Sequence, residues 1–502
     1  MTAALLDRRR HLLPRWRSPR LAAVAGELST RPNTARVQHL EAELEHRLRS
    51  VDSARPEDVL SAVVELLIAA RAANEKEVAQ TARNLILGDQ TASIALRDTV
   101  EALDLRSAPS PNDPAAIIAN ARRRLLHQPH SPITWMELAR GRLLLGDTRD
   151  ARRALLVARN LAPTDRLISR AYARFLVHES QFDEAHALLA RHPRLVVDPW
   201  LQASEIAVAR LAGRTAVSLS RVRYDLRSRT TPVTEWSELS AAVATAEFEA
   251  GNSGRARSLM RLAIEGGHDN ALAQALSLQR DGLRVSDEAL EEKVMRHPLG
   301  FEARMQRAFI GADWEGVWSE GRQWQEDQGF STQPSYVLTV VASVGLLDPE
   351  RTLEAAQMGL AAKASDATVR NNHAYALLLL GRTTEASAIL DSVQSKLETL
   401  PLDERTALTA TKGLLAYRTG NEALGAALYT EAARLAESGG RKRTALAATL
   451  YHEWMRAQLK LPPLAPAAVD RPTADPILKA IQRHIKNEVV VLRPSSLGQT
   501  QS

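Results

Sequence analysis

Residues 132–165, PITWMELARGRLLLGDTRDARRALLVARNLAPTD, decide the fold. They read as one helix, a turn at Gly146 and Asp147, a second helix and a closing Pro163. Gly146 suits the left-handed residue that ends a helix, and Asp147 suits the cap of the next one. Pro163 ends the second helix because it has no N–H and clashes with the preceding turn. A single hairpin cannot bury its apolar face, so this unit predicts further copies of itself.

The apolar and small residues of this unit fall at fixed places. Counted from Pro132 as position 1, positions 4, 7, 8, 15, 20, 24, 27 and 32 hold Trp135, Leu138, Ala139, Gly146, Ala151, Leu155, Ala158 and Pro163. Residues three and four apart share one face of a helix, and the alanines allow two helices to approach closely. The pattern resembles the tetratricopeptide repeat (TPR). The resemblance implies an all-α fold, a right-handed superhelical solenoid of antiparallel helix pairs, with ligands in the groove lined by the first helices.

The turn residue of the unit recurs along the chain. It is found at Gly146, Ser180, Gly213, Gly251, Gly282, Gly311, Gly345, Gly381 and Gly420. The eight intervals between residues 146 and 420 average close to 34 residues, the period of the TPR family. The repeats are therefore expected to run through most of the chain.

Composition divides the chain into five expected segments. They are a basic flexible arm (1–33), an N-terminal helical region (34–114), the TPR-like array (115–459), a Pro/Ala-rich extended linker (460–476), and a short helix with a C-terminal tail (477–502). The β-branched run at 488–492, EVVVL, is suited to pairing with a sheet edge of another molecule. Two alternatives stay open: residues 477–492 fold back on the array, or they occupy its groove.

The residue counts bound the class of protein. The chain has 502 residues, no cysteine and a formal net charge of +6, which is a small excess for its length. The absence of cysteine excludes disulfides and thiolate chemistry. No apolar run is long enough to span a membrane, and residues 1–20 lack the apolar core of a signal peptide. We therefore expect a cytoplasmic protein without a membrane partner.

The sequence predicts no catalytic residue, metal ligand or cofactor. Gly-Lys-Ser/Thr, HExxH and Gly-x-Ser-x-Gly are all absent, so the usual phosphate-binding, zinc and nucleophile motifs are missing. Trp314, Trp318 and Trp324 form the most prominent aromatic cluster. Such a cluster could stack nucleic-acid bases, but packing between repeats is the favoured interpretation. Thr444 is expected to cap a final helix of the stack at residues 444–459.

The favoured function is a non-catalytic scaffold or adaptor that binds a protein or peptide in the groove. In some peptide-binding TPR proteins an Asn at position 6 grips the partner, and the resemblance places Asn372 there, beside Arg370. The alternative is an accessory protein that contacts nucleic acid through Arg-rich segments, since Lys and Arg neutralise phosphates. Its candidate contacts are Arg8, Arg9, Arg10, Arg221, Arg223 and Arg227.

Overall fold

The computed structural model describes most of the chain. It covers residues 13–19, 76–90, 113–228, 236–285, 287–394, 400–489 and 491–492, and single positions between 60 and 100. Within these residues every regular element is a helix, so the all-α class is confirmed. The array that the sequence predicts to be continuous is divided into two compact units, which meet in sequence between Thr230 and Thr231. We refer to residues 13–230 as the N-terminal unit and residues 231–502 as the C-terminal unit.

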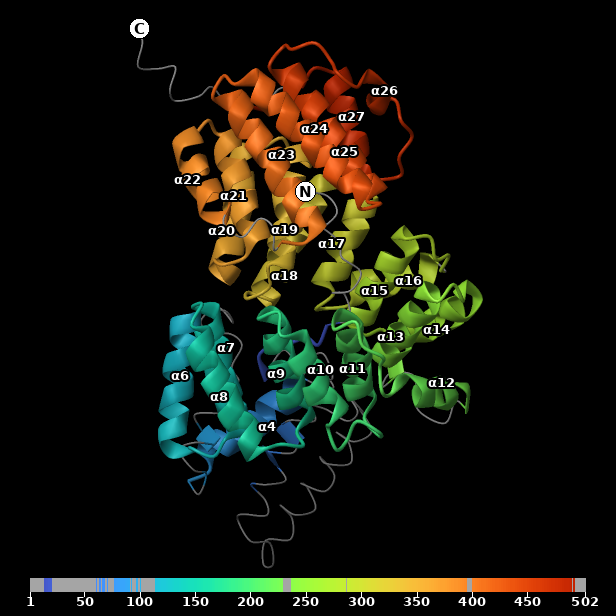
Figure 1. Cartoon of the computed structure of the whole chain (residues 1–502). Coiled ribbons are helices and arrows are strands. Elements are labelled where there is room, and N and C mark those ends of the chain that lie inside the picture. Colours follow the sequence, from blue (N-terminus) through green and yellow to red (C-terminus); the bar gives the residue numbers. More distant parts are fainter. Residues whose placement is uncertain are drawn as a thin grey trace, which may run out of the picture. The chain divides into compact units, whose positions relative to one another are not determined.

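The N-terminal unit is built of short helices joined by tight turns (Figure 1). They are α4 (Lys76–Gly88), α6 (Pro114–His127), α7 (Pro132–Leu144), α8 (Thr148–Leu161), α9 (Arg166–His178), α10 (Phe182–Ala190), α11 (Pro199–Leu211) and α12 (Leu219–Ser228). Helix α7 packs on α8 and α9 packs on α10, so consecutive helices form hairpins. The first helices of the pairs, α7, α9 and α11, also contact one another. This unit therefore has the two-layer arrangement of a solenoid.

The C-terminal unit repeats this arrangement. Its helices are α13 (Ser237–Glu249), α14 (Ser253–Gly266), α15 (Asp269–Arg280), α16 (Asp287–Arg296), α17 (Phe301–Ile310), α18 (Trp314–Asp327), α19 (Gln333–Val340), the π-helical turn η4 (Val341–Gly345), α20 (Pro349–Lys363), α21 (Ala367–Leu379), α22 (Thr383–Gln394), α23 (Leu402–Arg418), α24 (Glu422–Ser438), α25 (Lys442–Gln458), α26 (Pro466–Val469) and α27 (Pro476–Lys486). The first helices α19, α21, α23 and α25 pack side by side in sequence order. Their side chains share one core with α27.

Local chemistry explains where these helices begin. The Asp147 side chain accepts a hydrogen bond from the Asp150 amide at the start of α8, as predicted. Asp165 and Asp366 cap α9 and α21 in the same way. Each cap satisfies an amide that has no partner inside the helix. The final helix differs from the prediction, because α25 begins at Lys442 and the Thr444 hydroxyl donates to Asp403 instead of capping it.

Most of the predicted turn residues adopt the left-handed conformation. Positive φ angles are found at Gly146, Ser180, Gly213, Gly251, Gly282, Gly381 and Gly420. The predicted turn at Gly311 is also present, between α17 and α18, but Gly311 has φ −76° and Ala312 takes the left-handed position at φ 56°. At the next turn Leu347 is the left-handed residue, and Gly345 lies at the predicted place, at the end of η4. A Cβ there would lie 2.6 Å from Cγ of Trp314, so this glycine serves close packing.

The aromatic cluster belongs to the core. Trp318 and Trp324 are buried, and Trp314 meets the edge of Phe309 with ring centroids 5.9 Å apart. Arg351 lies over the Trp318 ring at 5.4 Å. The packing interpretation of the cluster is thus confirmed, and the base-stacking alternative has no exposed ring surface in Trp318 or Trp324 to use.

The prediction of a flexible arm at residues 1–33 differs from the structure over the described residues of that segment. Residues 13–18 lie within that segment and are all buried, with Trp16 at 0 % exposed and Arg17 at 1 %. A side chain of this size is buried completely only when its backbone is held in place. The basic residues Arg8, Arg9 and Arg10 lie outside the described residues, as does the helix expected at 34–49.

The C-terminal segments also differ from the prediction. The expected extended linker contains the short helix α26, and its Leu464 and Ala465 amides donate to the buried Glu453 carboxylate at 3.1 and 2.8 Å. The described residues 488, 489, 491 and 492 form no strand, and residues 489, 491 and 492 are bonded to α25 instead. Trp454 donates to the Val489 carbonyl, and Gln458 accepts from the amides of Val491 and Leu492. The side chains of Glu453, Trp454 and Gln458 on α25 thus hold these two C-terminal segments in place.

Candidate functional site: the inner face of the first helices

Two of the first helices, α11 and α15, are buried on all sides. In α11 the ten consecutive residues from Trp200 to Ala209 are buried, and in α15 the ten from Asp269 to Leu278 are buried. Successive residues of a helix point about 100° apart, so ten buried residues in a row leave no face in contact with solvent. The second helix α8 buries only residues 151, 154, 155 and 158, which form one stripe. In α11 and α15 the face that would line an open groove is therefore covered.

Polar side chains recur on these buried helices at a fixed interval. Glu238, Asn270 and Glu302 are 32 residues apart, each the second residue of its helix, and all are 5 % exposed or less. The Asn270 side-chain amide donates to Glu238 at 2.6 Å, which joins α13 to α15. One turn further along α15, the Gln274 side-chain amide donates to the Thr245 hydroxyl of α13 at 3.0 Å. Buried polar groups are costly unless bonded, so these contacts fix the register of neighbouring first helices.

The predicted partner residues lie on α21. Asn372 is 5 % exposed and Arg370 is half-buried. The neighbouring Asn371 was not predicted. It is 2 % exposed, and neither atom of its amide has a hydrogen-bond partner among the described residues. Helical spacing could have found it, because Asn371 lies one turn before the buried Tyr375 on the same face of α21.

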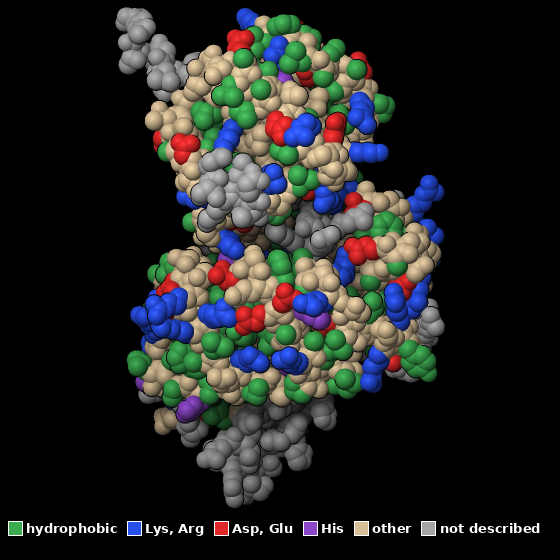
Figure 2. All heavy atoms as spheres, viewed as in Figure 1, with side chains coloured by type: hydrophobic (Ala, Val, Ile, Leu, Met, Phe, Trp, Pro, Cys, Tyr) green, Lys and Arg blue, Asp and Glu red, His purple; other side chains and the backbone are tan. Residues whose placement is uncertain are grey.

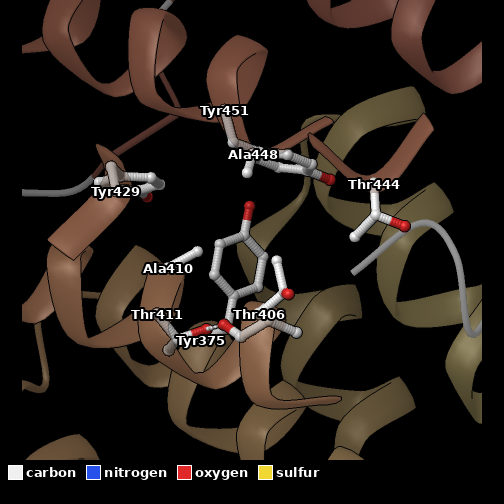
Figure 3. Close-up of a pocket in the computed structure, with 9 residues that line it drawn as sticks. Tyr375, Thr406, Ala410, Thr411, Tyr429, Thr444, Ala448 and Tyr451 are labelled. Carbon is white, nitrogen blue, oxygen red and sulfur yellow. Dashed lines mark hydrogen bonds between the residues drawn. The ribbon is translucent and has the colours of Figure 1, made fainter. Parts of the chain in front are cut away.

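A small cavity opens beside Tyr375 (Figure 3). Four helices, α21, α23, α24 and α25, line it with Tyr375, Tyr429, Tyr451, Thr406, Thr411, Thr444 and three alanines. Its volume is about 20 Å³. One water molecule needs roughly 10–15 Å³ by this measure, whereas sites for drug-sized ligands span hundreds of Å³. The cavity therefore has room for water and excludes an organic ligand.

The chemistry of this cavity also fits water. Tyr375 and Tyr451 meet edge to face with ring centroids 6.3 Å apart. The Tyr451 hydroxyl has no hydrogen-bond partner among the described residues. Burial raises the pKa of both phenols well above the usual 10, so both remain protonated donors. The Thr406 and Thr411 hydroxyls donate to carbonyls of their own helix. No acid–base pair results from this arrangement.

The most deeply buried carboxylate of the N-terminal unit is a structural group. Glu205 is 0 % exposed, and its Oε1 lies 3.0 Å from His186 Nε2 and 2.8 Å from the Val217 amide. Its Oε2 accepts from the amide and the hydroxyl of Ser218. Both oxygens accept hydrogen bonds, so Glu205 fastens the loop before α12 to α11.

A histidine on α25 belongs to a second buried network. The His452 ring stacks on Tyr429 at 4.8 Å, and its Nε2 lies 2.7 Å from the Tyr417 hydroxyl. Arg456 donates to the same hydroxyl at 3.2 Å, so the Tyr417 proton points to Nε2. Burial first, and the Arg456 charge second, lower the pKa of His452 from 6.5 to about 4. The ring is a neutral acceptor at physiological pH.

The candidate nucleic-acid residues that can be placed are on α12. Arg221 pairs with Asp225 at 3.6 Å, and Arg223 is half-buried. Helix α12 also carries Arg227, whose side chain lies outside the described residues. Tyr224, which lies between Arg223 and Arg227 in the sequence, is 73 % exposed.

The structure also bears on metals and membranes. Among the described residues, no group of three His, Asp or Glu side chains is arranged to hold a metal ion. No helix in this part of the chain combines the length and the apolar character needed to cross a bilayer.

Comparison with known proteins adds little to this picture. No family model and no curated protein sequence matches the chain. A solved structure of yeast Tom70 is 13 % identical and covers 86 % of this chain and 97 % of its own, with a TM-score of 0.35. A Naa15/Naa10 complex bound to HypK-THB contains a chain that is also 13 % identical, with coverages of 86 % and 79 % and a TM-score of 0.23. At these TM-scores the likenesses carry no argument about function, and the account rests on the helices themselves.

Proposed function

We propose that this chain is a non-catalytic, TPR-like scaffold or adaptor that binds a protein or peptide partner at the inner face of its first helices. The observation that carries the proposal is Asn371, a buried amide on the first helix α21 whose donor and acceptor are both unused among the described residues. An unpaired buried amide is costly to retain, so its presence calls for an explanation. The backbone of an incoming peptide offers both the carbonyl and the amide that would satisfy it.

The test uses a variant that keeps the fold. Asn371→Ala removes an amide without a protein partner, so thermal stability should change little. The tagged wild type, Asn371→Ala and the outer-face control Glu431→Ala are used to capture partners from native lysate treated with nuclease. Glu431 lies on α24, where its partly exposed side chain pairs with Arg434 at 2.7 Å. The proposal expects one stoichiometric protein that is lost from Asn371→Ala and retained by Glu431→Ala. Equal capture by all three chains would refute a partner at this face.

No specific observation favours the nucleic-acid alternative. Arginines of the outer layer join neighbouring helix pairs instead, as in Arg152 with Glu184 and Arg351 with Glu315. On the face shown in Figure 2, basic and acidic side chains are interspersed. The alternative predicts recovery that disappears with nuclease and binding that weakens steeply with salt. The cytoplasmic location stays a prediction, which cell fractionation would test.

A further inference from the structure

Helix α27 connects two first helices that are far apart in sequence. It packs against α25 and against η4, while α21 and α23 lie between those two in the layer. The helix is beside α25 in Figure 1. Because α27 contacts both ends of one layer of first helices, it lies on the inner side of that layer. It therefore packs on the layer of first helices to which α21, the helix of Asn371, belongs.

The buried side of α27 is apolar. Ile477, Leu478, Ala480 and Ile481 are 3 % exposed or less and belong to the same core as Trp454. Residues three and four apart share one face of a helix, which groups Ile477 with Ala480 and Ile481, and Leu478 lies beside them. On the opposite side Lys479 and Arg483 are exposed. The surface formed by η4 and α25 thus binds a short amphipathic helix through three branched apolar side chains, those of Ile477, Leu478 and Ile481.

Three polar contacts orient α27 on this surface. Asp475 caps the helix by accepting from the Ile477 amide at 2.9 Å, and it also pairs with Arg443 of α25. His484 Nε2 donates to the Val344 carbonyl at 2.7 Å. That carbonyl is at the end of η4, where helix carbonyls lack intrahelical partners. The His484 ring stacks on Trp454 at 5.3 Å. The Arg443 side chain therefore lies at one end of this surface, and the Val344 carbonyl lies at the other.

We propose that this surface of η4 and α25 is a helix-acceptor site, filled in the resting chain by α27, and that the partner presents a short amphipathic helix of the same pattern. The proposal rests on the proposed function. The partner helix carries an acid at its N-cap, branched apolar residues at positions 2, 3 and 6, and a hydrogen-bond donor at position 9, as in α27. An 11-residue helix is unstable alone, so α27 is helical only while it is docked. Its tether, residues 459–475, gives it a high local concentration, which the partner must overcome.

The test measures competition with the chain's own helix. The probe is a fluorescein-labelled peptide of residues 474–492, and its binding to the full chain is followed by fluorescence anisotropy. The full chain is used as wild type, as Ile481→Ala and as the exposed control Lys479→Ala. Ile481→Ala weakens the docking of α27 but leaves the residues of η4 and α25 unchanged. The probe should bind this variant at least ~10-fold more tightly than it binds wild type, since losing a buried Ile weakens docking by more than that factor. Lys479→Ala should behave as wild type.

Peptide variants supply a readout that does not depend on the folding of a mutant chain. The probe carrying Ile481→Ala should bind the Ile481→Ala chain at least ~10-fold more weakly than the unmodified probe. The probe carrying Lys479→Ala should bind unchanged. Equal affinity of the unmodified probe for all three chains, or no binding to any, would overturn the acceptor site.

The outcomes of this test distinguish a failure of the acceptor site from a failure of the proposed function. A captured partner that the peptide displaces supports both proposals. A captured partner that the peptide leaves bound refutes the stated chemistry of the partner while the scaffold function stands. Tight peptide binding to Ile481→Ala without any captured partner supports the acceptor site and counts against the scaffold function.

Discussion

Acid should destabilise the C-terminal unit through one buried histidine. His452 is 5 % exposed, accepts a hydrogen bond from Tyr417 and lies beside the Arg456 cation. Protonation at Nε2 would break that bond and place two positive charges together in the core. The folded chain therefore holds the pKa of His452 at about 4, against 6.5 in the unfolded chain.

The sign and size of the effect follow from this difference. Between these two pKa values the unfolded chain binds the proton and the folded chain does not, so a falling pH favours unfolding. The contribution of His452 is intact above about pH 6.5 and is lost progressively as the pH falls to about 4. The whole difference corresponds to about 3 kcal/mol of free energy of unfolding. About 2 kcal/mol of it should be measurable between pH 7 and pH 4.5, since this window ends above the folded pKa and does not span the whole difference.

The assay compares wild type with His452→Gln, which does not titrate and keeps an acceptor for Tyr417. Urea unfolding is followed at each pH by pulse proteolysis, and the surviving fragments are identified by mass, so that the C-terminal unit is read separately. The free energy of unfolding of the wild type should fall between the two pH values by about 2 kcal/mol more than that of the variant. Equal losses for the two chains, or an NMR pKa of His452 above about 6, would refute this reasoning.

Three further substitutions test the packing. Gly345→Ala should destabilise the C-terminal unit by about 2 kcal/mol in urea unfolding because its Cβ would overlap the Trp314 ring, whereas Gly254→Ala, in open space on α14, should be neutral or stabilising. Glu205→Ala should cost the N-terminal unit about 3 kcal/mol in the same measurement, because it leaves buried donors unpaired; an unchanged midpoint would contradict the account of that carboxylate. Tyr451→Phe should cost about 1 kcal/mol if water fills the cavity, and a crystal structure should show that water beside the hydroxyl; a dry cavity would contradict the assignment.

The sequence predicted the elements whose signals are local. The helix pair beginning at Pro132 ends and restarts at the Gly146–Asp147 turn, because a left-handed residue and a cap need only their neighbours. The same reasoning places the turn at Gly345 but not its left-handed residue, which is Leu347. The glycine is required there by Trp314, a residue 31 positions earlier, and spacing along the chain does not reveal that contact.

The candidate site was less predictable than the fold. The family resemblance directed attention to Asn372 at position 6, while the amide without partners belongs to Asn371. Which of two adjacent side chains faces the inner layer depends on the rotation of α21, and neighbouring helices set that rotation. The covering of the inner face was also not predicted as the favoured outcome. The amphipathic pattern of α27 indicates that it needs a partner surface but does not say which one.

The most direct test of the central claim is side-chain oxidation by hydroxyl radicals on the intact chain, read residue by residue by mass spectrometry. The claim is that the inner face is covered by the chain itself and becomes available when its own segments are exchanged. Trp454 beneath α27 is 0 % exposed, whereas Tyr224 on the outer layer is 73 % exposed. We predict that Trp454 is oxidised much more slowly than Tyr224 in wild type and faster in Ile481→Ala than in wild type. Oxidation of Trp454 as fast as Tyr224 in wild type would mean that the inner face is open, and would contradict the account.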